Sequence, residues 1–154
     1  MARIDFAFGA EQRLTQACQT VLRQYLAGQR VLVYCPDEQR LATFDRLLWA
    51  VEDTAFVPHV TSDSVHAASV AVVMVQSNLD DALSKLKEHT WLLNLSDDCQ
   101  PNIGSVNRVL EIVSEDEDDK LAARARWSVY KTQGHEIKAH RLGCLLYTSP
   151  SPRD

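Results

Sequence analysis

The sequence predicts a single α/β domain built on an open, mostly parallel sheet flanked by helices. Residues 31–35 (VLVYC) form a continuous apolar run, which is typical of a strand buried on both faces of a parallel sheet. Segments with apolar residues at helical spacing alternate with strand-like runs along the chain. This alternation favours parallel strands joined by helical crossovers.

The composition fits one globular domain and argues against two broad classes. The chain has 154 residues, 45% of them hydrophobic and 24% charged, which allows an adequate core. Its net charge of -5 argues against nucleic-acid binding by the protein surface as a whole. No apolar run has the length of a membrane span, and the N-terminus has no signal-peptide pattern. The four cysteines are widely spaced and fit free thiols, so we expect a cytoplasmic protein without membrane contact.

The N-terminal part of the chain is expected to form strand, helix and strand in that order. Apolar residues alternate with polar ones over 3–8, which predicts a first strand at an edge of the sheet. Helical spacing of apolar residues follows over 14–25, and Gly28 ends this helix. The buried strand at 31–35 comes next.

A second helix is expected to begin after Asp37 and to leave one large aromatic outside the core. Its core face consists of Leu41, Phe44, Leu47, Leu48 and Val51. Trp49 points away from that face. The following segment, 54–60, has no regular pattern although it holds Phe56, Val57 and Pro58 together, and 61–68 is expected to be a loop.

The rest of the chain supplies the remaining strands and a tail. Strands are expected at 69–75, 91–95 and 109–113, with a weak helix over 79–87. From Cys144 the sequence CLLYTSPSPRD has no helical or strand period and is typical of a cloning scar or a disordered tail. We therefore expect a domain over 1–142 and a non-native or disordered tail over 143–154.

The segment after the strand at 109–113 predicts a long helix with an acidic start and a basic body. Ser114 is expected to be the N-cap in a capping box with Glu117, and Gly134 to end the helix. Five carboxylates at 115–119 lie where the helix dipole favours negative charge. The face expected to be buried contains Leu121, Ala122, Ala125 and Val129.

A second face of this helix is basic and carries an aromatic residue. At about 100° per residue, Lys120, Arg124, Trp127 and Lys131 fall within a sector of about 60°. Basic stripes are often simply solvated helix faces. An indole between cations, however, suits a ligand that is both apolar and anionic. Direct binding of single-stranded nucleic acid is an alternative, although stacking platforms usually present several aromatic residues.

No residue pattern predicts a cofactor, a metal ion or a catalytic site. The five glycines form neither a dinucleotide-binding motif nor a phosphate-binding loop. The five histidines lack metal-ligand spacing, and the carboxylates at 115–119 point in different directions around a helix start. The polar residues 96–98 follow a strand end without an evident pair of nucleophile and base. A small α/β enzyme with an unrecognised site is therefore the weakest alternative.

Three segments together resemble the chi subunit of bacterial DNA polymerase III, an accessory protein of the clamp loader. They are RVLVYCPDEQR at 30–40, LLWAVEDTAFVPHV at 47–60 and RVLEIVSEDEDDKLAARARWSVYKTQG at 108–134. The resemblance covers about residues 1–142 and implies a Rossmann-like fold without catalytic activity. It also implies two protein partners, the psi subunit and the acidic, Phe-ending tail of single-stranded-DNA-binding protein, with DNA contacted only indirectly.

The resemblance assigns residues to both partner surfaces. The tail pocket would use Val113, Lys120, Arg124, Trp127 and Lys131. Ser128 departs from the family pattern, since many relatives carry Lys or Arg there, and it marks the margin of this pocket. The psi surface would use Trp49 together with Phe56, Val57, Pro58 and His59, with Phe56 as a core residue being the alternative. Whether a helicase shares the Trp49 surface stays open.

The composition of the C-terminal segment generates a first prediction. Deleting 144–154 should leave the melting temperature unchanged, because the segment has no pattern able to bury apolar area. Thermal unfolding of the full and the shortened chain, followed by circular dichroism, measures this. A lower melting temperature for the shortened chain would make the tail part of the fold.

Overall fold

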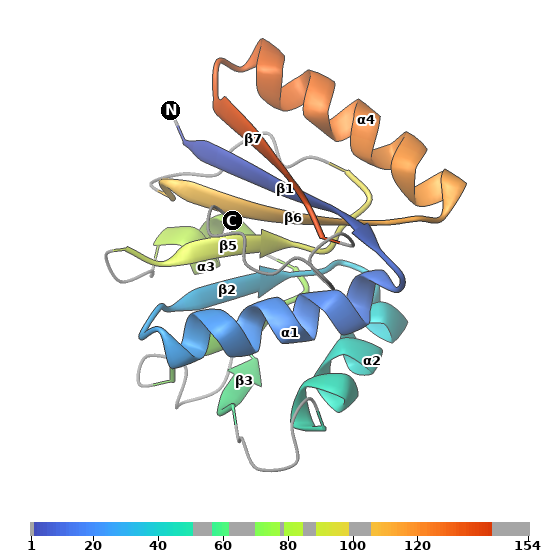
Figure 1. Cartoon of the computed structure of the whole chain (residues 1–154). Helices are drawn as coiled ribbons and strands as arrows, with labels where there is room; N and C mark the ends of the chain where they lie inside the picture. The colour runs from blue at the N-terminus through green and yellow to red at the C-terminus, as the bar shows by residue number, and fades with distance from the viewer. Residues whose placement is uncertain are drawn as a thin grey trace.

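The computed structural model of the chain is a seven-stranded sheet with helices on both faces (Figure 1). It describes residues 2–50, 57–61, 70–77, 79–84, 89–98 and 106–142. The strand order is β3-β4-β2-β5-β6-β1-β7, and every pairing between neighbours is parallel. The predicted open, parallel α/β fold is thereby confirmed. The predicted tail at 143–154 lies outside the described residues.

Strands and helices follow one another in the expected order, with two additional strands. The strands are β1 (Arg3–Ala10), β2 (Val31–Tyr34), β3 (His59–Thr61), β4 (Val72–Val75), β5 (Trp91–Asn94), β6 (Arg108–Ser114) and β7 (Glu136–Arg141). The helices are α1 (Arg13–Leu26), α2 (Glu38–Trp49), α3 (Leu79–Ser84) and α4 (Glu117–Thr132). No helix in the described part of the chain combines the length and the apolar character that a bilayer span requires.

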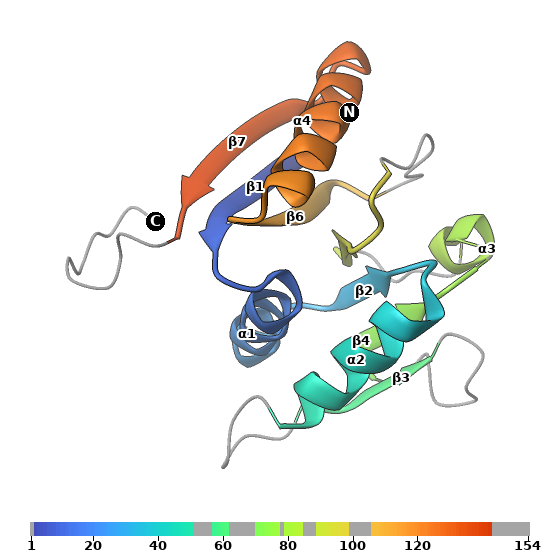
Figure 2. The ribbon, with the colours of Figure 1, turned by 90° about the vertical axis from the view of Figure 1, so that its right-hand side faces the viewer.

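The sheet separates two apolar cores, each covered by a pair of helices (Figure 2). On one face, Cys18 of α1 and Phe44 of α2 pack with Val31 and Val33 of β2. On the other face, residues of α3 and α4 pack with Leu32 and with the strands β1 and β6. Neighbouring residues of β2 thus enter opposite cores, as the two-residue period of a strand requires. This is why the run 31–35 is apolar without interruption.

The first strand does not lie at an edge of the sheet, contrary to the prediction. β1 pairs with β6 on one side and with β7 on the other. The sequence does not predict β7, because most side chains of this strand are exposed and its apolar alternation is therefore weak. The three-residue strand β3 was not predicted either, because it begins at His59 in a segment without a regular pattern.

The start of α4 also differs from the prediction. The N-cap is Asp116, whose side chain accepts a hydrogen bond from the backbone N–H of Asp119 at 3.1 Å. Ser114 is instead the last residue of β6, and its hydroxyl donates to the Asp119 carboxylate at 2.7 Å. The Ser114–Glu117 capping box is therefore wrong, because β6 continues through Ser114 and the helix begins later. In α2, by contrast, the helix begins after Asp37 as expected, and the Asp37 side chain caps it by accepting hydrogen bonds from the backbone N–H groups of Gln39 and Arg40.

The predicted buried face of α4 is wrong as well. The side chains of Leu121 and Val129 are 64% and 42% exposed, and the helix buries Ala123, Arg126 and Tyr130 instead. An arginine at the centre of a core face contradicts the hydrophobic pattern on which the prediction rested. Its burial requires a specific partner on the sheet.

That partner is Glu111 on β6, which is fully buried. Arg126 Nε donates to Glu111 Oε1 at 2.9 Å, and Tyr130 Oη donates to Glu111 Oε2 at 2.6 Å. Asn94 Nδ2 of β5 donates to Oε2 as well, at 2.9 Å. Arg126 Nη1 donates to the carbonyl oxygen of Asp97, whereas Nη2 has no hydrogen-bond partner among the described residues. This buried polar cluster fixes α4 on the sheet in one rotational setting.

The buried cluster generates a stability prediction. Replacing Arg126 with alanine should lower the free energy of unfolding by about 3–5 kcal/mol, because Glu111 would keep a buried charge without its partner. Arg124→Ala, which removes an exposed arginine of the same helix, is the matched control and should change stability little. Urea unfolding monitored by circular dichroism compares the two variants. Equal stability of both would show that the buried pair does not hold α4.

Candidate functional site

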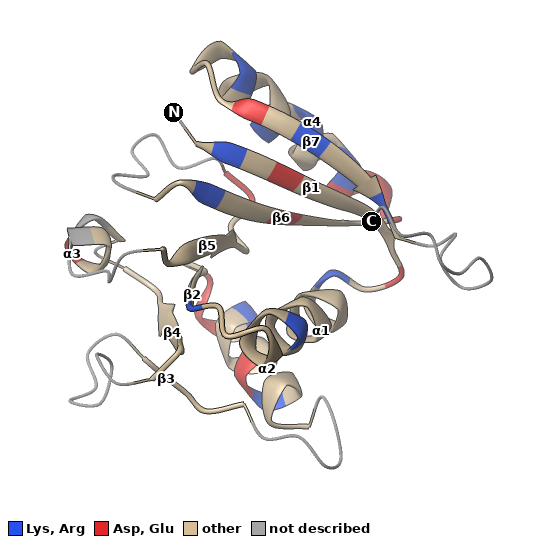
Figure 3. Ribbon diagram, turned by 60° about the vertical axis from the view of Figure 1, so that its left-hand side comes forward, with Lys and Arg blue, Asp and Glu red and all other residues tan. Residues whose placement is uncertain are grey.

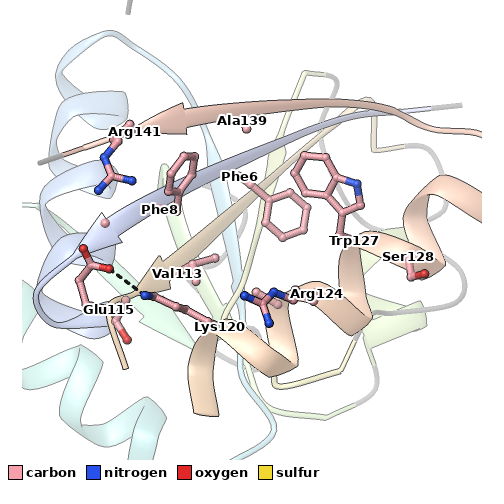
Figure 4. Close-up of a pocket in the computed structure, with 13 residues that line it drawn as sticks. Phe6, Phe8, Val113, Glu115, Lys120, Arg124, Trp127, Ser128, Ala139 and Arg141 are labelled. Atoms are coloured by element: carbon pink, nitrogen blue, oxygen red, sulfur yellow. Dashed lines mark ion pairs between the residues drawn. The ribbon is translucent and has the colours of Figure 1, made fainter. Parts of the chain in front are cut away.

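A pocket of about 560 Å³ lies between α4 and the carboxyl-terminal ends of β1, β6 and β7 (Figure 4). Ligands of parallel α/β sheets commonly bind at this end of the strands. The lining residues come from all four elements and from the turn after β6. They are Phe6, Phe8, Gly9, Val113, Ser114, Glu115, Lys120, Ala123, Arg124, Trp127, Ser128, Ala139 and Arg141.

The apolar part of the pocket is built on aromatic residues of β1 and α4. Phe6 and Phe8 are two residues apart on β1 and therefore face the same side of the sheet. The ring centroids of Phe6 and Trp127 are 5.0 Å apart, and those of Phe6 and Tyr130 are 6.0 Å apart in an edge-on arrangement. Phe6 is buried and Trp127 is half-buried. The indole therefore packs on the Phe6 ring while part of it lines the pocket.

A row of side chains across three strands forms the end of the pocket opposite Trp127. Phe8 of β1 is in register with Val113 of β6 and with Arg141 of β7. Directly after Phe8, β1 has an irregularity at Gly9, whose φ of 94° lies in the left-handed region that favours glycine. The backbone N–H of Glu115 donates to the carbonyl oxygen of Ala10 at 2.9 Å and attaches the following turn to this strand end.

Three cations lie around the apolar part of the pocket, two from α4 and one from β7 (Figure 4). Both elements carry blue Lys or Arg positions along their ribbons in Figure 3. Lys120 Nζ forms ion pairs with Glu115 at 3.3 Å and with Glu117 at 3.5 Å. The guanidinium of Arg141 lies over the ring of Phe8, with its central carbon 5.4 Å from the ring centroid. Among the described residues, Arg124 and Arg141 have no carboxylate within ion-pair distance. The pocket therefore offers an apolar slot and two cations available to an anionic ligand.

The pocket contains most, but not all, of the residues that the sequence analysis grouped together. Val113, Lys120, Arg124, Trp127 and Ser128 line it. Lys131 is exposed one turn further along α4 and does not line it.

Several pocket residues were not predicted. Phe6 and Phe8 were assigned to a strand, but nothing in the sequence indicated that α4 would lie across it. Ala139 and Arg141 were missed because β7 itself was not predicted. Glu115 had been assigned only a role near the helix start, whereas it also pairs with Lys120.

The second predicted surface, around Trp49, is only partly exposed. The Trp49 side chain is 48% exposed, as expected, and its ring lies 4.2 Å from that of His59. Val57 and His59 are buried, although the resemblance assigned both to the surface that contacts psi, where exposed anchors are expected. Pro58 is half-buried, and Phe56 lies outside the described residues.

Contacts with the core and with α2 explain this burial. Val57 packs in the apolar core that α1 and α2 cover. His59 Nε2 lies 2.8 Å from the carboxylate of Asp45, and Nδ1 lies 2.7 Å from the carbonyl oxygen of Val57. His59 therefore connects the segment before β3 to α2, and a partner at this surface would contact Trp49 and Pro58 before it reached His59.

Other polar groups at the same end of the sheet serve the fold. The Arg13 guanidinium donates to the carbonyl oxygens of Asn94, Ser96 and Ile112 and thereby connects α1 to β5 and β6. A hydrogen bond from Arg40 lowers the pKa of Asp97 despite partial burial. Within the described residues, no group of three or more His, Cys, Asp or Glu side chains is arranged to hold a metal ion.

The two described cysteines are not activated as nucleophiles. Both Cys18 and Cys35 are free and buried. Burial raises the pKa of the Cys18 thiol to about 12 and also raises that of Cys35. The thiolate is the reactive form of cysteine, so neither side chain is poised for attack near neutral pH.

Comparisons with known proteins agree on one family. The model of the family described as "DNA polymerase III chi subunit, HolC" matches residues 1–138. The chain is 28% identical over 146 residues to the DNA polymerase III subunit chi of Pseudomonas aeruginosa PAO1. This alignment covers 92% of this chain and 98% of that protein. It is 23% identical over 127 residues to the subunit chi of Haemophilus influenzae, covering 82% and 85% of the two chains. With the subunit chi of Escherichia coli K12 it shares 22% identity over 120 residues, covering 78% and 79%.

Proposed function

The chain belongs to the DNA polymerase III chi subunit family, and on this premise we propose that it is a non-catalytic adaptor of the replication machinery. In this role it joins the clamp loader, through the psi subunit, to the C-terminal tail of single-stranded-DNA-binding protein, and it works in the cytoplasm. The observation that carries the proposal is the pocket under α4, where an apolar slot lies between cations.

The chemistry of the pocket fits an acidic peptide that ends in phenylalanine. The terminal ring would enter the slot between Trp127 and Val113, and the α-carboxylate would bind Arg124. A guanidinium can engage a carboxylate through two parallel hydrogen bonds, which makes Arg124 the best candidate among the α4 cations. Lys120 would contribute less, because its ammonium group already pairs with Glu115 and Glu117.

Direct binding of single-stranded DNA fits the same surface less well. A stacking platform needs several accessible aromatic faces along a basic groove. Here Phe6 is buried and packs against both Trp127 and Tyr130, so these rings contact one another rather than presenting successive free faces. Glu115 and Glu117 also place negative charge beside Lys120. These features support a protein partner, with DNA reached only through it.

For the psi subunit we propose the surface around Trp49. A half-exposed tryptophan is a typical interface anchor because it brings a large apolar area at low entropic cost. Pro58 lies in the segment next to it and is half-buried. Phe56 remains part of this proposal on the family resemblance alone, and a helicase is a further candidate partner for the same surface.

The first functional prediction concerns the tail pocket. Arg124→Ala should weaken binding of an acidic peptide that ends in Pro-Phe by about 1.5–3 kcal/mol, the range for a hydrogen bond to a charged group. Binding should also weaken with added salt, which screens exposed charges. Ser128→Arg should strengthen it by adding a cation at the pocket margin. Fluorescence anisotropy with labelled peptide measures all three effects.

Two controls make this experiment decisive. Arg23→Ala removes an exposed arginine from α1, on the other face of the sheet, and should leave peptide affinity unchanged. A peptide that lacks the terminal Phe should bind weakly to every variant. Equal binding of both peptides would rule out the apolar slot, and tight binding of single-stranded DNA without peptide binding would favour the alternative.

The second functional prediction concerns psi. Trp49→Ala should weaken psi binding by at least about 2 kcal/mol, the size of an interface hot spot, while the domain stays folded. Phe56→Ala carries the same expectation. Leu26→Ala, which removes an exposed leucine from α1, is the matched control and should change nothing. Calorimetric titration with psi, together with a melting curve for each variant, would refute the assignment if Trp49→Ala bound psi normally.

A further inference from the structure

The pocket has a second basic side that belongs to β7. Arg141 is the last residue of this strand, and its position is set by pairing in register with Phe8 of β1. The next backbone N–H, that of Leu142, donates to the carbonyl oxygen of Phe8 at 2.9 Å and continues the ladder. Arg141 is therefore held by a strand of the sheet beside the pocket.

The Phe8 ring supports the Arg141 guanidinium in this position. The cation lies 5.4 Å from the ring centroid, within the range in which an aromatic face attracts it. The side chain is exposed, and none of the described carboxylates pairs with it. The planar group can therefore still form charge-assisted hydrogen bonds with a ligand while one of its faces rests on Phe8.

The guanidinium groups of Arg124 and Arg141, neither of which has an ion-pair partner among the described residues, lie on different sides of the apolar slot (Figure 4). Arg124 projects from α4 beside Trp127, whereas Arg141 projects from β7 beside Phe8. A single carboxylate bound by Arg124 would leave Arg141 without an anionic partner. A ligand that uses both must carry two carboxylates at separate positions along its chain.

We infer that Arg141 is a specificity residue that binds an acidic side chain of the peptide upstream of its terminal aromatic residue, while Arg124 binds the terminal carboxylate. This inference rests on the proposed function of the pocket and adds a selection rule to it. The pocket distinguishes an acidic tail from a neutral tail with the same final residues. Arg141 lies on β7 and is not part of the basic face of α4, so this distinction depends on a residue outside that helix.

A purely structural role for Arg141 makes a different prediction. If the side chain only shields Phe8 from water, its removal would loosen the apolar slot. Every peptide ending in Phe would then bind less tightly, whatever its upstream charge. The response to upstream charge therefore separates the two roles.

The test uses two peptides that end in Pro-Phe with a free carboxylate and differ only upstream. One carries Asp residues there, and the other carries Asn at the same positions. Arg141→Gln should weaken binding of the Asp peptide about fivefold, as expected for an exposed ion pair, and leave the Asn peptide unchanged. Arg124→Gln should weaken both peptides. Arg141→Lys should keep part of the preference, because it retains the charge.

Lys138→Gln is the matched control for the loss of positive charge on the same strand. Lys138 lies an odd number of residues from Arg141, faces the other side of the sheet and does not line the pocket. This variant should bind both peptides as the unaltered protein does. Anisotropy titrations at one low salt concentration measure all the variants, and melting curves confirm that each is folded.

Two outcomes would overturn the inference alone, and a third would also overturn the proposed function of the pocket. Equal weakening of both peptides by Arg141→Gln would assign Arg141 the structural role. An unchanged preference for the Asp peptide would show that Arg141 does not bind it. If the unaltered protein bound neither peptide, the proposed function of the pocket would fail together with the inference.

Discussion

The fold and the pocket both depend on the buried ion pair between Glu111 and Arg126. Withdrawing two charges from water costs several kcal/mol per ion unless further hydrogen bonds compensate. Tyr130 and Asn94 supply such bonds to the Glu111 carboxylate. Because Glu111 lies on β6 inside the sheet, only one rotation and one position of α4 bring Arg126 to it. The pair therefore determines which residues of α4 face the ends of β1, β6 and β7.

This constraint explains why the prediction from sequence grouped several pocket residues correctly but assigned the wrong buried face to α4. Grouping Lys120, Arg124 and Trp127 depends only on helical periodicity, which holds whichever way the helix is turned. Choosing the buried face requires the rotation itself. The apolar residues Leu121 and Val129 indicated one rotation, and the Glu111–Arg126 pair imposes another. A charged pair contributed by two separate elements leaves no local pattern from which this could be predicted.

The remaining differences between prediction and structure have a common physical cause. Strands buried on both faces, such as β2, have strong apolar patterns and were found. The edge strand β7 buries little of its side-chain area, so its pattern is weak, and Arg141 went unnoticed with it. Val57 was assigned to the psi surface by family resemblance, yet it packs in the core. Sequence periodicity thus predicts elements whose side chains alternate regularly between core and solvent. It does not predict sites formed by residues that are distant in the sequence.

The pocket also combines two kinds of residue from distant segments: apolar residues packed in or against the core, and cations at its margin. Its apolar slot is built on Phe6, Phe8 and Val113 of β1 and β6, which belong to or pack against one of the two apolar cores. Arg124 and Arg141 project from exposed positions on α4 and β7, where water and salt compete with any ligand, whereas Lys120 is partly buried. Lys120 must exchange Glu115 or Glu117 for a ligand carboxylate, so its net contribution to binding is smaller than its charge suggests. Under the proposed function we therefore expect the slot to provide most of the affinity. Arg124 and Arg141, which have no ion-pair partner among the described residues, would then select which anionic chains bind.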